Sequence, residues 1–289
     1  MTALLHSMKM RVIICAALAA TLLASSTYDR VIEAWRRNRE IELKADDGWL
    51  TVAGLFWLHD GENTAGSDSS SSILLPRGPT HLGTFTYRGG KVTFHAARGI
   101  QVSAPAVLRP DTVKGGPDSI QFSDFTMFVI RRGTRNAIRL KDKQSDFRKA
   151  FTGLHWYPPR EDYRIIAKWL PYAAPKRLVV PNILGETERQ PSPGYAVFQL
   201  RGREYQLHPV LEDKQLFFIF KDQTSGKGTY ASGRFLYADL ASHGQLVLDF
   251  NKAYNPPCAF TPYATCPLPP AQNRLAVRIE AGELNYGRH

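Results

Sequence analysis

The feature that most limits the fold is a change of hydrophobic periodicity after Gly48. From there on, short runs alternate apolar and polar residues with a period of two, and Gly, Pro, Asn or Ser bound them. This alternation is typical of β-strands, because successive side chains of a strand point to opposite faces of its sheet. The runs are WLTVAGLFWL, TFTYRGGKVTFH, SIQFSDFTMFVIRR, RNAIRLKD, YRIIAKWL, KRLVVPN, GYAVFQLRGREYQLHPV, QLFFIFKD, RFLYADL, QLVLDF and RLAVRIE. The sequence therefore predicts a mostly β protein built of antiparallel β-sandwich or barrel units.

Turn residues divide these runs. Gly89 and Gly90 fall between two strand-like runs and predict a two-residue hairpin turn. Residues 184–194 and 223–233 are rich in Gly, Ser, Pro and charged residues, and we expect both to be connections between strands.

One helix is predicted before the strands. Thr27 is a suitable cap, and apolar or aromatic residues follow it at helical spacing. These are Tyr28, Val31, Ile32 and Trp35. Residues 145–151 predict a further short helical turn with Ser145 as its cap.

Residues 1–26 have the pattern of an export signal. Lys9 and Arg11 precede an apolar run over residues 12–24, and small residues follow it. A membrane anchor that is not cleaved is the alternative, but the run is shorter than the roughly 20 residues of a spanning helix. We expect an exported protein, periplasmic or extracellular, whose mature chain has no stable membrane span.

The rest of the chain is long enough for two β units. We expect the helix and a sandwich-like unit over residues 27–150 and a second β unit over residues 151–289, with one continuous domain as the alternative. The formal net charge of +11 is spread along the chain and not gathered into a basic block. This distribution argues against a nucleic-acid partner.

The segment from Asp249 to Arg274 contains Cys258, Cys266 and many prolines. The spacing of the two cysteines does not fit a zinc knuckle, and we expect no metal and no cofactor. In an oxidising compartment the two thiols are expected to pair as a disulfide; free buried thiols and metal or redox chemistry remain alternatives.

Candidate binding residues follow from this loop and from strand ends. A fixed loop can present Asn251, Tyr254 and Asn255 to a ligand, although such residues also cap turns and satisfy buried backbone groups. The other binding candidates are Arg139, Asp142, His155 and Arg234. If the protein is an enzyme, Glu212 and Asp222 are the candidate acid–base residues.

Four long stretches resemble the bacterial family called domain of unknown function 1684. They are DGWLTVAGLFWLHDGENTAGSD, GLHWYPPREDYRIIAKWLPY, LFFIFKDQTSGKGTYASGRFLYADL and LDFNKAYNPPCAFTPYATCPLPPAQNRLAVRIEAGE. The resemblance covers nearly all of the chain after the leader, and it implies no activity, substrate or site residue.

A weaker resemblance lies in the first β unit. GENTAGSDSSSSILLP followed by HLGTFTYRGGKVTFH is similar to the opening strands of a forkhead-associated domain, a β-sandwich that binds phosphothreonine peptides. The family's phosphate-binding arginines have no counterpart at Gly66-Ser67 or at residues 80–83. The resemblance therefore implies a sandwich fold without phosphopeptide binding.

Nucleophile, metalloprotease and phosphate-loop motifs are missing from the sequence. Several tryptophans, Trp49 and Trp57 among them, can line a cleft. The sequence favours an exported protein that binds a small molecule or a glycan, with an exported hydrolase that uses carboxylates as the alternative.

Overall fold

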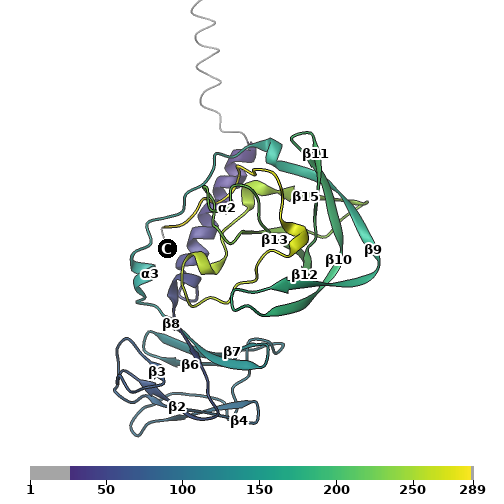
Figure 1. Cartoon of the computed structure of the whole chain (residues 1–289). Helices are drawn as coiled ribbons and strands as arrows, with labels where there is room; N and C mark the ends of the chain where they lie inside the picture. The colour runs from purple at the N-terminus through teal and green to yellow at the C-terminus, as the bar shows by residue number, and fades with distance from the viewer. Residues whose placement is uncertain (1–26, 288–289) are drawn as a thin grey trace, which may run out of the picture.

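The structure is a computed structural model that describes residues 27–287. It contains two β units, one above the other in Figure 1. The N-terminal β unit comprises β1 to β8, and the C-terminal β unit comprises β9 to β15 with the segment that follows them. The predicted export signal over residues 1–26 lies outside the described residues.

The N-terminal β unit consists of two four-stranded sheets. One sheet has the order β1 (Val52–Trp57), β8 (Arg135–Asp142), β7 (Phe125–Arg132) and β6 (Ser119–Phe122). The other has the order β3 (Ile73–Leu74), β2 (Gly61–Gly66), β4 (Gly83–Arg88) and β5 (Lys91–Ala96). All neighbouring strands are antiparallel except the β2–β3 pair. Apolar residues of both sheets, such as Phe85 and Leu140, form a shared core.

The predicted hairpin between β4 and β5 is confirmed. Gly89 and Gly90 connect the strands with φ angles of 55° and 78°. Two positive φ angles in a two-residue loop match the right-handed twist of the flanking strands.

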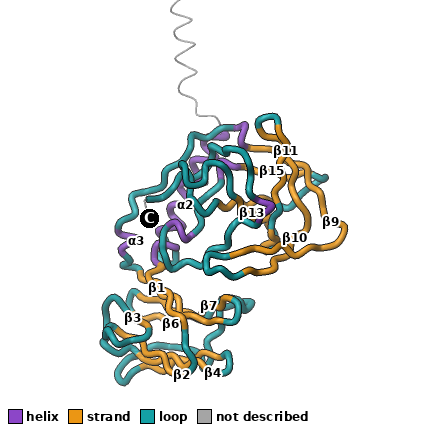
Figure 2. Tube along the Cα trace, viewed as in Figure 1, coloured by secondary structure: helices purple, strands orange, loops and turns teal. Residues whose placement is uncertain are grey.

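The C-terminal β unit also contains two sheets, seen as orange strands in the upper part of Figure 2. One sheet has the order β11 (Arg203–Leu207), β10 (Thr187–Leu200), β9 (Arg164–Pro181) and β15 (Gln245–Asp249). The other has the order β12 (Val210–Glu212), β13 (Gln215–Phe220) and β14 (Arg234–Asp239). Aromatic residues such as Phe198, Phe218 and Phe250 fill the core of this unit. The predicted mostly β, antiparallel fold is confirmed. No sheet within residues 27–287 closes on itself, so the barrel alternative is not formed.

The predicted connection over residues 184–194 is wrong. Thr187 pairs with Pro181 and Gly194 with Pro171, so most of the segment belongs to a long hairpin of β9 and β10. The turn itself spans residues 182–186, where the side-chain oxygen of Asn182 accepts the backbone N–H of Leu184 at 2.9 Å. Polar composition concealed this strand because its first half is mostly exposed.

The predicted strand over residues 274–280 is also wrong. Leu275, Val277 and Ile279 are buried alternately, so the period of two is real. The backbone, however, forms isolated bonds and no ladder, among them the Leu275 N–H to the Lys221 carbonyl at 2.7 Å and the Gln223 N–H to the Val277 carbonyl at 2.9 Å. The alternation thus reflects an extended segment over the core that joins no sheet.

The predicted N-terminal helix is α2 (Thr27–Lys44), and it packs on the C-terminal β unit (Figure 1). Ile32 and Leu43 are buried, and the hydroxyl of Tyr28 donates to Asp249 at 2.7 Å. No helix of the described residues is long and apolar enough to cross a membrane.

Short helices complete the chain. They are η1 (Trp49–Thr51), α3 (Asp146–Lys149), η2 (Glu161–Tyr163), η3 (Phe250–Lys252), η4 (Pro257–Ala259) and η5 (Ala271–Asn273). The predicted cap of α3 is confirmed, because the Ser145 hydroxyl accepts the Phe147 N–H at 3.2 Å.

Candidate functional site

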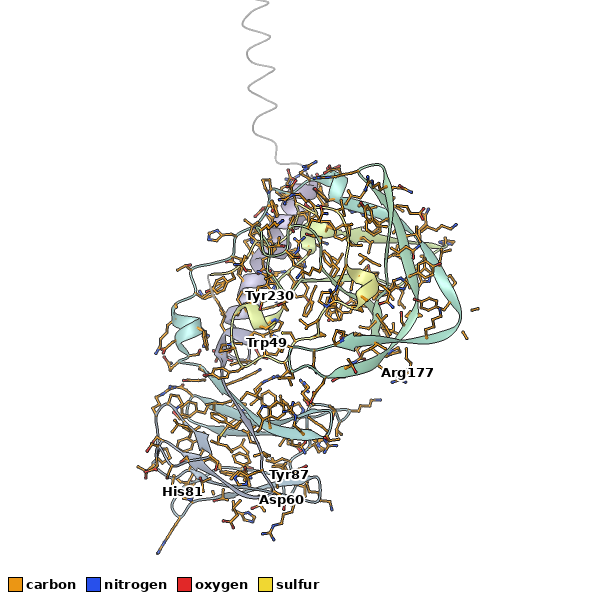
Figure 3. All side chains as sticks on the ribbon, viewed as in Figure 1. Trp49, Asp60, His81, Tyr87, Arg177 and Tyr230 are labelled. Atoms are coloured by element: carbon orange, nitrogen blue, oxygen red, sulfur yellow. The ribbon has the colours of Figure 1, made fainter. Side chains whose placement is uncertain are left out.

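A pocket of about 300 Å³ lies where α2, the N-terminal β unit and the C-terminal β unit meet. We call it the junction pocket. Trp49, in η1 between α2 and β1 and labelled in Figure 3, forms part of its wall. The polar and aromatic residues that line it include Arg39, Trp49, Arg132, Glu212, Tyr237 and Tyr254. A neighbouring hollow of about 240 Å³ shares Arg132, Glu212 and Thr265 with it.

One wall of the junction pocket is aromatic because of strand alternation. On β13, Phe218 and Phe220 point into the core of the C-terminal β unit, which leaves Phe217 on the opposite face. Phe217 is the register partner of Tyr237 on β14, and their rings stack at 4.7 Å. Tyr254 extends this wall, since its ring lies nearly parallel to that of Tyr237 with centroids 6.4 Å apart. The result is a surface of ring faces and edges that suits a flat ligand.

Glu212 and Tyr237 form the polar rim of this wall. The Tyr237 hydroxyl donates to Oε2 of Glu212 at 2.6 Å. Burial, followed by this hydrogen bond, raises the pKa of Tyr237 well above its usual value. Tyr237 is therefore a neutral donor at physiological pH, and Glu212 supplies an acceptor at the pocket mouth.

The lining of the junction pocket also includes two arginines, Arg39 and Arg132. Arg39 donates to the Asn255 carbonyl at 3.1 Å, and its guanidinium lies 4.5 Å from the centre of the Tyr254 ring. Arg132 donates through Nε to the Thr265 hydroxyl at 2.8 Å and through Nη1 to Asp111 at 2.8 Å. These contacts fix both guanidinium groups at the pocket wall.

The predicted candidate Arg139 lies behind Thr265, which lines the junction pocket. It projects from β8, is 4% exposed, and its Nη2 is 3.4 Å from the hydroxyl of Thr265. Its guanidinium lies 5.2 Å from the centre of the Trp49 ring. Burial, together with the charge of Arg132, lowers the pKa of Arg139 to about 10.

The predicted loop residues have different positions. Tyr254 lines the junction pocket. Asn251 does not: its side chain is fully buried and bonds both to the backbone N–H of Arg160 at 3.0 Å and to the Arg160 carbonyl at 2.7 Å. Asn255 likewise donates to the Leu284 carbonyl at 2.7 Å. Both amides hold the loop in place, which is the structural alternative that the sequence left open.

Three further candidates lie away from the junction pocket. Asp142 forms a two-pronged ion pair with Arg77 in the N-terminal β unit, with both distances 2.6 Å. His155 is exposed beside the C-terminal segment. Arg234 pairs with Asp222 at 2.6 Å in the interior of the C-terminal β unit.

The predicted catalytic pair is therefore not assembled. Glu212 lines the junction pocket, whereas Asp222 is 5% exposed and is engaged by Arg234 and by the backbone N–H of Thr224 at 2.6 Å. No group of three or more His, Cys, Asp or Glu side chains within residues 27–287 is arranged to hold a metal ion.

The predicted disulfide is absent, because Cys258 and Cys266 are free buried thiols. The backbone N–H of Cys258 donates to the sulfur of Cys266 at 3.1 Å, and burial raises the pKa of Cys266. Hydrogen bonds across the molecule hold the loop instead. Among them are Thr261 Oγ1 to the Val52 carbonyl at 2.9 Å and the Leu268 N–H to the Pro181 carbonyl at 2.7 Å.

Sequence reasoning missed several residues of the site, namely Arg39, Arg132, Thr265 and Tyr237. Arg39 lies on α2, outside the apolar spacing that predicted this helix, and it contacts the loop at Asn255. The tryptophans were the one signal in the sequence that pointed to this pocket. Trp49 was predicted to be able to line a cleft, and it lines the junction pocket.

Fold and site together define a two-unit antiparallel β protein with an aromatic and cationic pocket at the junction. The family is identified by comparison: residues 149–284 match the model described as "Protein of unknown function (DUF1684)", and the chain belongs to this family. The matched residues coincide with most of the C-terminal β unit. Arg39, Trp49 and Arg132 lie outside the matched range.

One solved structure is similar to part of this chain. It is the solution NMR structure of an uncharacterized protein of Haloarcula marismortui, which is 33% identical over 47% of this chain and 78% of that chain, with a TM-score of 0.40. The comparison with curated proteins gives no match.

Proposed function

We propose that the protein binds a small molecule in the junction pocket. One observation carries the proposal: aromatic rings and hydrogen-bonding groups from α2 and both β units converge on a single pocket. Ligand sites in proteins are typically concave, mostly apolar, and equipped with a few fixed polar groups. The rings of Phe217, Tyr237 and Tyr254 and the side chains of Arg132 and Glu212 provide this combination.

The size of the junction pocket limits the ligand. Its volume of about 300 Å³ is at the lower end of the roughly 300–1,000 Å³ that is usual for small-molecule sites. A single flat or sugar-like ring with a short substituent fits this space. A glycan would therefore enter by one terminal ring, stacked on the aromatic wall.

The hydrolase alternative is less well supported. A glycosidase-type mechanism needs two carboxyl groups on either side of the bond that breaks. Glu212 lines the junction pocket, but Asp222 is held by Arg234 inside the C-terminal β unit. Binding without turnover is accordingly the function that we propose.

The test is a ligand screen with two matched tryptophan variants. Thermal shift against a metabolite library, followed by calorimetry of the hits, measures binding to the wild type. Trp49→Ala removes a ring from the junction pocket, whereas Trp57→Ala removes an equally half-buried ring outside it. We expect at least a tenfold loss of affinity in Trp49→Ala alone. Hits that lose affinity equally in both variants, or turnover of the bound compound, would contradict the proposal.

We also propose that the protein is exported to the periplasm or the extracellular space. The basic residues Lys9 and Arg11, followed by an apolar run and small residues, support this location. Fractionation of the native host, with mass spectrometry of the purified N-terminus, tests it. A full-length chain recovered from the cytosol would contradict export.

A further inference from the structure

Arg139 is a buried cation without a counterion in the described part of the chain. It is 4% exposed, and its Nη2 reaches only neutral oxygens, the Tyr263 carbonyl and the Thr265 hydroxyl, both at 3.4 Å. Within residues 27–287 its Nε has no hydrogen-bond partner. A buried charge is normally paired or fully hydrogen-bonded, because it has lost its hydration. Arg139 meets neither condition.

The acids closest to this region are already engaged. Asp111 accepts from Arg132 Nη1 at 2.8 Å and from the backbone N–H of Arg131 at 2.9 Å. Glu212 accepts the hydroxyl of Tyr237. The Trp49 ring at 5.2 Å offers Arg139 a favourable face but no negative charge. Within residues 27–287, no carboxylate therefore forms an ion pair with the Arg139 guanidinium behind the junction pocket.

Thr265 connects this charge to the junction pocket. Its hydroxyl oxygen is 2.8 Å from Nε of Arg132 and 3.4 Å from Nη2 of Arg139. Two guanidinium groups therefore converge on one small side chain that lines the pocket. Guanidinium groups bind carboxylates through paired, charge-assisted hydrogen bonds.

We infer that the ligand of the junction pocket is an organic acid with a planar ring, whose carboxylate binds beside Thr265 between Arg132 and Arg139. This inference rests on the proposed function and adds the ligand's charge and shape to it. With the carboxylate beside Thr265, the ring would lie against the aromatic wall that Phe217, Tyr237 and Tyr254 contribute to the junction pocket. A volume of about 300 Å³ admits one ring and a short chain between ring and acid.

The experiment compares matched pairs of acids and their primary amides. The probes are benzoate, phenylacetate, 3-phenylpropionate and indole-3-acetate, each with its amide, measured by thermal shift and calorimetry at constant ionic strength. We expect the wild type to bind at least one acid, and at least tenfold more tightly than its amide. In Arg139→Gln this preference should disappear. Arg135→Gln is the matched control, because Arg135 lies on the same strand but is exposed and paired with Glu186.

Each outcome decides between the two proposals. Amides that bind as well as their acids, or library hits that are neutral while no acid binds, would overturn the inference and leave the junction pocket a binding site. A library without any hit, with no acid bound either, would overturn both proposals. If Arg139→Gln fails to fold, the acid-to-amide ratio of the wild type and the response of Arg132→Gln still decide the question.

Discussion

Two buried arginines, one inside the C-terminal β unit and one at the junction, have opposite environments. Arg234 is 1% exposed and is satisfied throughout: it pairs with Asp222 at 2.6 Å and donates to the carbonyls of Ile279 and Ala281. Arg139 is 4% exposed, and its hydrogen bonds within the described residues are two long ones to neutral oxygens. The first environment is that of a structural residue, whereas the second leaves a charge available to a ligand.

The difference arises from where each strand is placed. Arg234 opens β14, and the segment over residues 275–281 covers it with carbonyl groups. Arg139 lies in β8, which faces the junction, and the neighbouring strands offer it no carboxylate. Removing one partner of a buried ion pair leaves an uncompensated charge in the interior, whereas a buried, unpaired cation beside a pocket is a candidate for ligand binding.

The largest effect is expected from breaking the satisfied pair. Arg234→Met leaves the Asp222 carboxylate buried without its partner, and removing one member of a buried ion pair costs about 3–5 kcal/mol. Urea unfolding followed by fluorescence measures the change. Asp162→Asn, which breaks an exposed pair with Arg160, is the control and should leave the free energy of unfolding nearly unchanged. Equal effects in both variants would remove the distinction between the two environments.

Glu283 should make stability depend on pH. It is fully buried, its Oε1 has no partner within the described residues, and burial raises its pKa to about 7. Since this value lies above that of an unfolded glutamate, the folded state holds the proton more tightly than the unfolded state. Its contribution to stability is therefore complete below about pH 4.5 and is lost as pH rises through about 7.

The loss from this group is at most about 3 kcal/mol. The measurement is the free energy of unfolding of the wild type and of Glu283→Gln at pH 5 and pH 8. We expect the difference between the two proteins to shift in favour of Glu283→Gln at pH 8. Glu280 is partly exposed and paired with Arg201 and Arg278, so Glu280→Gln is the control and should leave the wild-type pH trend in place. A constant difference between wild type and Glu283→Gln would show that Glu283 does not titrate in this range.

The sequence predicted the local elements of this fold well. Helix α2, the β4–β5 hairpin and the cap at Ser145 depend on spacing, glycine and a hydroxyl, all of which act within a few residues. The β9–β10 hairpin was missed, because pairing with β9 extends a polar segment that has no strand pattern of its own. Residues 274–280 show the converse, since alternate burial of Leu275 and Val277 produces the pattern without a sheet.

The candidate site was predicted only in part for the same reason. Tyr254, Glu212 and Arg139 were chosen from loop and strand-end positions, and all three lie at or directly behind the junction pocket. Arg132 and Thr265 belong to different β units, and only the packing of one unit on the other brings them to 2.8 Å. The disulfide prediction was wrong within this same loop, where backbone and side-chain hydrogen bonds hold free thiols.

Removing the unsatisfied arginine should have a small effect on the ligand-free protein. Arg139→Met keeps most of the side-chain volume beside Trp49, while it removes a buried charge that has no ion-pair partner within residues 27–287. Replacing buried charges by apolar groups of similar size is often neutral or stabilising. We expect a change within about 1 kcal/mol of zero or a gain, measured by urea unfolding without added ligand. A loss as large as that of Arg234→Met would mean that Arg139 is a structural residue.

The smallest effect is expected at the rim of the junction pocket. Tyr237→Phe removes the hydrogen bond to Glu212, and a single hydrogen bond contributes about 0.5–1.5 kcal/mol, with less at an exposed position. We expect a loss of stability of about 0.5 kcal/mol, because water can reach the exposed Glu212 once the hydroxyl is gone. Affinity for the acids described above should remain within about threefold, since the ring face that stacks on the ligand is retained. A larger loss of affinity than of stability would place the Tyr237 hydroxyl in contact with the ligand, and the carboxylate would then lie at the Glu212 rim and not beside Arg139.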